Sequence, residues 1–155
     1  MPDHDLCPEL MLDNQLCFAL HSTSLLMTKV YKPLLKELSL TYPQYLAMLV
    51  LWESDGITVG EISKRLLTDP GSLTPLLKRL EAEGLLKRQR SKHDERVVEL
   101  HLSAAGKALK QRARAVPRCI VTAADQSLEE LVSLRDQLLK LRRSLQHSLA
   151  TEVAD

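Results

Sequence analysis

The strongest constraint on this fold is a pair of short helical segments joined by a tight turn. Thr58 with Glu61 three residues later is a capping-box signature, which opens a helix expected over Val59–Leu67. The turn Thr68-Asp69-Pro70-Gly71 follows, and a second helix is expected over about Ser72–Glu83. Two short helices separated by such a turn predict a helix-turn-helix motif.

The start of the second helix has two competing signals. Proline is tolerated in the first turn of a helix, so Pro75 favours Ser72 as the N-cap residue. Asp69 followed by Pro70 is also a good start signal. The sequence alone leaves this boundary open.

The hydrophobic period changes directly after Gly84, which ends the second helix in a C′ position. Residues 85–90 and 96–102 read as two short strands, and the polar segment 91–95 lies between them. This pattern predicts a β-hairpin with a charged tip. A helix-turn-helix followed by a hairpin is a winged helix-turn-helix arrangement, expected here over residues 42–102.

Long helices are expected before and within the first part of this region. An apolar stripe spans residues 13–38, with Asp13 as the expected N-cap and Pro33 as a point where the helix bends or stops. A second helix follows Thr41, with Pro43 in its first turn. Because that helix is apolar almost all round, we expect it to be buried.

The C-terminal third is also predicted to be helical. Ser103 caps a helix expected to run to residue 124, with a kink at Pro117. Ser127 and Glu130 form another capping box. The final helix carries leucines in near-heptad spacing, at Leu128, Leu131, Leu134, Leu138, Leu141 and Leu145.

One small winged-helix core cannot cover all these apolar stripes. We therefore expect residues 10–38 and 103–150 to pack against a second copy of the chain. The predicted fold class is mainly α with a small β-hairpin wing: a single domain over residues 1–155, with flanking dimerisation helices. A two-fold dimer presents two reading helices to successive turns of a pseudo-palindromic DNA site.

Composition and charge fit this interpretation. The net charge is only +1, but residues 87–96 carry five Lys or Arg, and residues 103–124 carry five with no acid. Such clusters can form a phosphate footprint on a nearly neutral chain.

No apolar run suits a membrane span, and the acidic residues 1–5 do not resemble a signal peptide, so a cytoplasmic protein is expected. The scattered His and the three Cys predict no metal site, no disulfide framework and no cofactor.

The second helix of the motif is expected to enter the major groove. Its N-terminal residues meet base edges in proteins of this kind. Ser and Thr hydroxyls can bond to bases or phosphates, and Lys and Arg mostly neutralise phosphates. The predicted contacts of this helix are Ser72, Thr74, Pro75, Lys78 and Arg79.

The hairpin is the second expected DNA-facing element. A narrow minor groove attracts an inserted arginine, and Asp94 is placed to hold Arg96 for that role. The alternative is a solvated hairpin with no partner. The predicted contacts of the hairpin are Arg88, Arg90, Lys92, Asp94 and Arg96.

Four segments together resemble the MarR family of winged-helix regulators, and within it the organic-hydroperoxide-sensing, OhrR-type branch. They are LDNQLCFAL at 12–20, LTYPQYL at 40–46, LTPLLKRLE at 73–81 and DER at 94–96. The resemblance implies that Cys17 is the peroxidatic sensor and that Tyr31 and Tyr42 contact its sulfur. It also implies that Cys119 is the resolving cysteine of a two-cysteine subclass, in a disulfide between subunits.

Helix geometry adds an independent constraint. Cys17 and Tyr31 are 14 residues apart, about four turns, so they share a helix face at a separation of roughly 21 Å. A hydrogen bond from Tyr31 to the sulfur must therefore come from the partner subunit. With Asp13 as N-cap, Cys17 lies at the end of the first turn, where amide donors and the helix dipole favour a thiolate.

The sequence thus predicts a homodimeric repressor that an organic hydroperoxide releases from double-stranded DNA by oxidising Cys17. A MarR-type repressor released by a small aromatic ligand, with structural cysteines, is the alternative within the class. A thiol peroxidase and a helical protein–protein adaptor are the alternatives of other classes. No thioredoxin-like βαβ pattern surrounds Cys17, which argues against the peroxidase.

Overall fold

The computed structural model describes residues 7–153, which belong to two compact units, Met1–Val116 and Pro117–Asp155. Residues 1–5, predicted not to form a signal peptide, lie outside the described part. Through Ala113 the elements are η1 (Pro8–Leu10), η2 (Leu12–Asn14), α1 (Leu16–Lys36), α2 (Tyr42–Glu53), β1 (Ile57–Thr58), α3 (Val59–Leu66), α4 (Pro70–Ala82), β2 (Leu86–Arg90), β3 (Val98–Leu102) and α5 (Ala104–Ala113). The remaining helices are α6 (Val116–Ala124) and α7 (Leu128–Val153).

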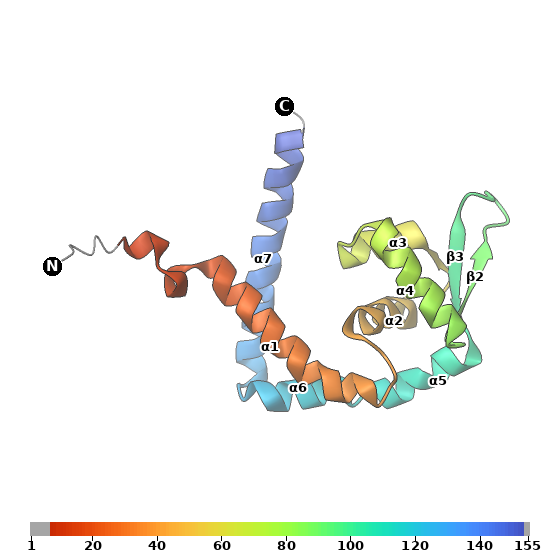
Figure 1. Cartoon of the computed structure of the whole chain (residues 1–155), viewed down its shortest axis with the longest axis horizontal. Helices are drawn as coiled ribbons and strands as arrows, with labels where there is room; N and C mark the ends of the chain where they lie inside the picture. Colours follow the sequence, from red (N-terminus) through yellow and green to blue (C-terminus); the bar gives the residue numbers. More distant parts are fainter. Residues whose placement is uncertain (1–6, 154–155) are drawn as a thin grey trace. The chain divides into compact units, whose positions relative to one another are not determined.

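Helices α2, α3 and α4 and the sheet form a winged helix-turn-helix, as the sequence predicts (Figure 1). The strands pair antiparallel in the order β1-β3-β2, with Arg88 opposite Leu100 in the hairpin. The two-residue strand β1 was not predicted, because its partner, β3, lies more than 40 residues further along the chain.

The core of the first unit is aliphatic and centres on α2. Met48 and Leu51 of α2 are fully buried, together with Ile62 of α3, Leu77 of α4 and Leu100 of β3. The side chains of α2 are apolar almost all round, which is the pattern of a helix with neighbours on most sides. This core fixes α4 at the surface of the unit and leaves its other face to solvent.

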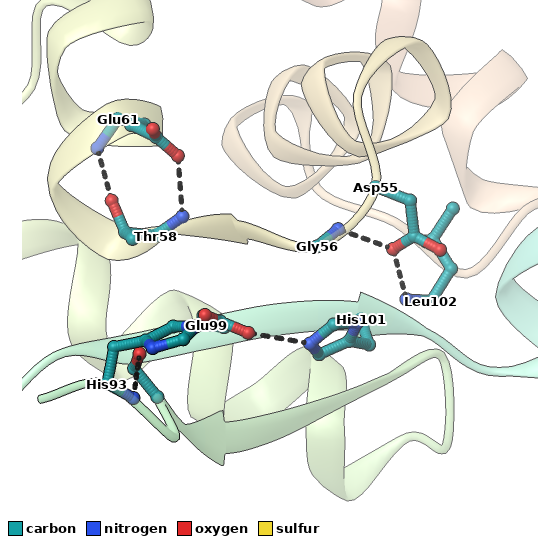
Figure 2. Close-up of polar contacts among 9 residues, drawn as sticks. Asp55, Gly56, Thr58, Glu61, His93, Glu99, His101 and Leu102 are labelled. Carbon is teal, nitrogen blue, oxygen red and sulfur yellow. Dashed lines mark hydrogen bonds and ion pairs between the residues drawn. The ribbon is translucent and has the colours of Figure 1, made fainter. Parts of the chain in front are cut away.

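Side-chain hydrogen bonds cap the start of α3 and join the turn after α2 to β3, as Figure 2 shows. The Thr58 hydroxyl accepts from the backbone N–H of Glu61 at 3.1 Å, and the Glu61 carboxylate accepts from the N–H of Thr58 at 2.8 Å. Asp55 Oδ1 accepts from the N–H of Gly56 and from the N–H of Leu102 at 2.8 Å. The carboxylate therefore ties the turn after α2 to the end of β3.

The first helix begins later than predicted. Its N-cap is Gln15 and not Asp13, because residues 12–14 form a 3₁₀ turn and Gln15 is extended. The Asn14 amide donates to the Pro8 carbonyl at 2.8 Å, which stabilises this turn. Pro33 does not stop the helix, since α1 continues to Lys36.

The start of α4 corrects the preference for Ser72 as N-cap. Asp69 is the N-cap, and its carboxylate accepts from both the backbone N–H and the hydroxyl of Ser72. Pro70 then occupies the first helical position, where no N–H is needed. Pro75 lies inside the helix, where it leaves the carbonyl of the exposed Gly71 to be hydrated.

The predicted single helix over residues 103–124 is two helices. Ser103 caps α5 as predicted, by accepting from the N–H of Gly106 at 3.0 Å. The helix is interrupted between Ala113 and Val116, because Pro117 has no N–H to donate to the carbonyl four residues earlier. Ser127 and Glu130 form the predicted capping box at the start of α7.

Candidate functional site

The predicted reading helix, α4, has one buried face and one exposed face. Leu73, Leu77 and Leu80 are at most 1% exposed and anchor the helix in the core. The predicted DNA contacts Ser72, Pro75, Lys78 and Arg79 are exposed, and Thr74 is half-buried. The structure thus brings these five residues onto the outer side of one helix.

The hydroxyl groups at the start of α4 already donate hydrogen bonds within the chain. Ser72 donates to the Asp69 carboxylate at 2.7 Å, and Thr74 donates to the Pro70 carbonyl at 2.9 Å. The hydrogen bond from the Ser72 hydroxyl, and to a smaller extent those from backbone N–H groups, lower the pKa of Asp69 below its ordinary value. The cap therefore stays ionised at neutral pH. Toward a ligand the two hydroxyls are therefore acceptors, which suits the exocyclic amino groups of adenine and cytosine.

The tip of the wing holds one arginine in a defined way. Asp94 Oδ1 accepts from the backbone N–H of Arg96 at 3.0 Å and from its Nε at 3.3 Å. The side chain of Arg96 is 92% exposed. The predicted pairing is thus present, and the guanidinium projects into solvent with its other edge free to meet phosphate or a groove.

The remaining predicted basic contacts lie on or beside β2. Arg90 and Lys92 are exposed, whereas the side chain of Arg88 is only 29% exposed. Arg88 faces Glu81 of α4, which accepts from the Arg88 backbone N–H at 2.7 Å. Sequence reasoning missed Glu81, because no local pattern links it to a residue seven positions later on another element.

Cys17 is the second residue of α1, and its side chain is exposed. The backbone N–H groups of a first helical turn have no partner within the helix, and the helix dipole favours negative charge there. The thiol is therefore accessible and lies nearer to the helix start than an Asp13 cap would have put it.

The three tyrosines of the chain form one cluster. The Tyr31 ring centroid lies 5.0 Å from that of Tyr42 and 5.8 Å from that of Tyr45. Burial, with smaller contributions from Tyr42 and Tyr45, raises the pKa of Tyr31 to about 12, and burial also raises the pKa of Tyr45. The Tyr31 and Tyr45 phenols therefore remain hydrogen-bond donors at neutral pH. Tyr45 was not predicted, although its position three residues after Tyr42 puts both on one helix face.

The second unit contributes the other cysteine. Cys119 is the fourth residue of α6 and is exposed. Most leucines of α7 are also exposed, including Leu134 at 47% and Leu145 at 55%. Within residues 7–153, no helix is long and apolar enough to cross a membrane.

Comparison with known proteins identifies this arrangement. The family model of the transcriptional regulators SarA/Rot matches residues 29–113, more than half of the chain. The chain belongs to this family of winged-helix transcriptional regulators. The regulator is 48% identical to the organic hydroperoxide resistance transcriptional regulator of Bacillus subtilis over 134 residues, which are 86% of this chain and 91% of that one. The resemblance to hydroperoxide-sensing MarR-type regulators is therefore confirmed.

Solved structures agree with the fold. Reduced AbfR bound to DNA matches the regulator with a TM-score of 0.78 at 34% identity, over 92% of this chain and 98% of that one. A disulfide form of AbfR matches with a TM-score of 0.60 at 34% identity, over 89% and 92% of the two chains. AbfR is a protein of Staphylococcus epidermidis. The predicted winged-helix fold is thus confirmed.

Proposed function

We propose that this regulator binds double-stranded DNA as a homodimer and represses transcription until an organic hydroperoxide oxidises Cys17. The observation that carries the proposal is an accessible thiol in the first turn of α1 of a winged-helix regulator. The similarity to an organic hydroperoxide resistance regulator supports the oxidant class. We expect the regulator to act in the cytoplasm.

The DNA contacts come from α4 and the wing. The exposed outer side of α4 enters the major groove, and Arg96, held by Asp94, reaches toward the adjacent minor groove. Arg90 and Lys92 neutralise phosphates beside the hairpin. The DNA-bound structure of reduced AbfR, at a TM-score of 0.78, supports this use of the fold.

The dimer is formed by helices that expose large apolar side chains. In α1, Leu25, Leu26 and Met27 are at least 44% exposed, and most leucines of α7 are exposed as well. Burying such side chains stabilises association by about 25 cal/mol for each Å² removed from water. A symmetric dimer also matches the two half-sites of a pseudo-palindromic operator.

The chemistry consumes two thiols for each hydroperoxide. The Cys17 thiolate attacks the terminal peroxide oxygen and breaks the O–O bond, which gives Cys17 sulfenic acid and the alcohol. The Cys119 thiol of the other subunit then attacks that sulfur and releases water, which leaves a disulfide. Tyr31 and Tyr42 donate hydrogen bonds to the sulfur across the dimer. Thiol exchange with a cellular dithiol reduces the disulfide and restores both thiols, which resets the proposed switch.

The release of DNA needs only a modest change in geometry. Oxidation shifts the two reading helices and wings out of register with the half-sites. A loss of about 4 kcal/mol in binding free energy weakens binding roughly 1000-fold, which is sufficient for induction.

A gel shift before and after cumene hydroperoxide tests the proposal, with a duplex selected by the protein from a random library. Cys17→Ser is expected to bind this duplex as tightly as the native chain and to ignore the oxidant. Retention of the oxidant response by Cys17→Ser contradicts redox sensing at this residue. Release by small aromatic acids instead of peroxide supports the ligand-controlled alternative.

A further inference from the structure

Two arginines of the wing each pair with a carboxylate that also accepts from their own backbone N–H. At the tip, Asp94 accepts from the backbone N–H of Arg96 and from its Nε. At the base, Glu81 Oε2 accepts from the backbone N–H of Arg88 at 2.7 Å, and Glu81 Oε1 lies 3.6 Å from the Nε of Arg88. Each carboxylate thus lies beside the Nε edge of a guanidinium, its inner edge, and accepts from the backbone N–H of the same residue.

The second pair differs in that it joins two elements. Glu81 lies in the last turn of α4, and Arg88 is the middle residue of β2. Strand β2 is an edge of the sheet, so the N–H of Arg88 that Glu81 covers would otherwise be open. The contact therefore restrains the angle between the reading helix and the base of the wing.

The environment of Arg88 leaves one side of its guanidinium for an outside partner. Nε is buried and has no hydrogen-bond partner among the described residues; the Glu81 carboxylate lies 3.6 Å away, at ion-pair distance. Within residues 7–153, the two terminal nitrogens of Arg88 donate no hydrogen bond, while the side chain keeps 29% of its surface exposed. An arginine whose inner edge faces a carboxylate and whose main chain is bonded to that same carboxylate directs its outer edge away from it, which suits a phosphate.

We propose that Glu81 is a positioning residue for DNA binding, which acts through Arg88. Glu81 holds the outer guanidinium edge of Arg88 toward a DNA phosphate at the base of the wing, and it ties the wing to α4. This inference rests on the proposed DNA contact of α4 and the wing.

Glu81→Gln gives a test in which two accounts predict opposite signs. Removal of an acid near DNA strengthens binding if only the overall field matters. If Glu81 positions Arg88, the same change weakens binding, by about tenfold for one lost charge-assisted contact. Glu83→Gln is the matched control, since Glu83 is an exposed acid at the end of α4 whose side chain makes no hydrogen bond within residues 7–153. We expect Glu83→Gln to bind as tightly as the native chain or more tightly.

The measurement is fluorescence anisotropy of the full chain on the selected duplex, at several salt concentrations. Arg88→Gln is expected to lose about tenfold in affinity and to lower the slope of log K against log salt by about 0.9, the value of one phosphate contact. Glu81→Gln combined with Arg88→Gln is expected to bind no more weakly than Arg88→Gln alone. A purely structural role of Glu81 would add its loss to that of Arg88.

Two results would overturn the inference: Glu81→Gln binding as tightly as the native chain, or additive losses in the double variant. If Glu81→Gln fails to fold in a thermal melt, Arg88→Lys decides, because lysine keeps the charge but has no Nε for Glu81 to hold. Full affinity in Arg88→Lys then overturns the inference. Salt-independent or absent binding by the native chain would instead contradict the proposed function itself.

Discussion

The ring centroids of Tyr31 and Tyr42 lie 5.0 Å apart, with the rings tilted by 52°, so that the last turns of α1 meet the first turn of α2. Tyr45 completes the cluster from the next turn of α2. Cys17 lies on the same helix as Tyr31 but about 21 Å along its axis. The proposed contact between the Tyr31 phenol and the Cys17 sulfur therefore requires the two residues to come from different subunits.

The raised pKa of Tyr31 predicts how stability changes in alkali. The pKa rises from 10.0 to about 12 because the phenol is buried. Between these values the unfolded chain has lost the proton and the folded chain keeps it, so stability falls as pH rises. We expect Tyr31→Phe to lose less stability than the native chain between pH 10 and about 12, measured by urea unfolding. Equal losses in the two proteins would show that Tyr31 is not the group responsible.

Gly106 is predicted to be intolerant of any side chain. A Cβ at this buried position would lie 2.1 Å from the carbonyl oxygen of Leu85, which is backbone and cannot move aside. Gly106→Ala is expected to cost about 1–3 kcal/mol or more in unfolding free energy, the usual cost of overpacking.

Gly60→Ala is the matched control for that substitution. Its Cβ would meet only the Thr58 hydroxyl, at 3.8 Å, on the exposed side of α3. Replacing glycine in a helix by alanine stabilises by about 0.5–1 kcal/mol. Urea midpoints should therefore shift in opposite directions for the two variants, and a loss of stability in Gly60→Ala would contradict this account of the helix.

The wing arginine predicts a change in salt dependence. Arg96→Ala removes a side chain that is 92% exposed, so folding should be unaffected. We expect DNA affinity to fall about tenfold and the salt slope to fall by about 0.9. Arg143→Ala, on α7, is the control, because it removes an exposed cation outside the proposed DNA surface. Matching effects of the two changes would indicate a general charge effect and no contact by the wing.

Features set by neighbours in the chain could be predicted from the sequence. The capping boxes of Thr58 and of Ser127 depend on residues three positions apart, and both are present. The hairpin follows from the change to a two-residue period, but its loop is longer than the polar run 91–95, because the last strand pair joins Arg90 to Val98 and leaves residues 96–97, predicted as strand, in the loop.

Features set by distant parts of the chain, or by a choice between two good local signals, could not be predicted. Asp69 and Ser72 are both good cap residues, and Asp69 prevails because its carboxylate binds two groups of Ser72 at once. Strand β1 exists only because Ile57 pairs with Leu100. The Glu81–Arg88 contact likewise needs α4 and β2 to be folded together before it can form.

The central claim is a disulfide between Cys17 of one subunit and Cys119 of the other, and complementary single-cysteine chains test it most directly. With Cys7 replaced by Ser throughout, one chain keeps only Cys17 and a second, of different length, keeps only Cys119. After the two are mixed, exchanged and treated with cumene hydroperoxide, non-reducing electrophoresis should show one crosslinked species, the mixed dimer, together with loss of DNA binding. A mixture that stays uncrosslinked, or a crosslink in either chain treated alone, would contradict the claim.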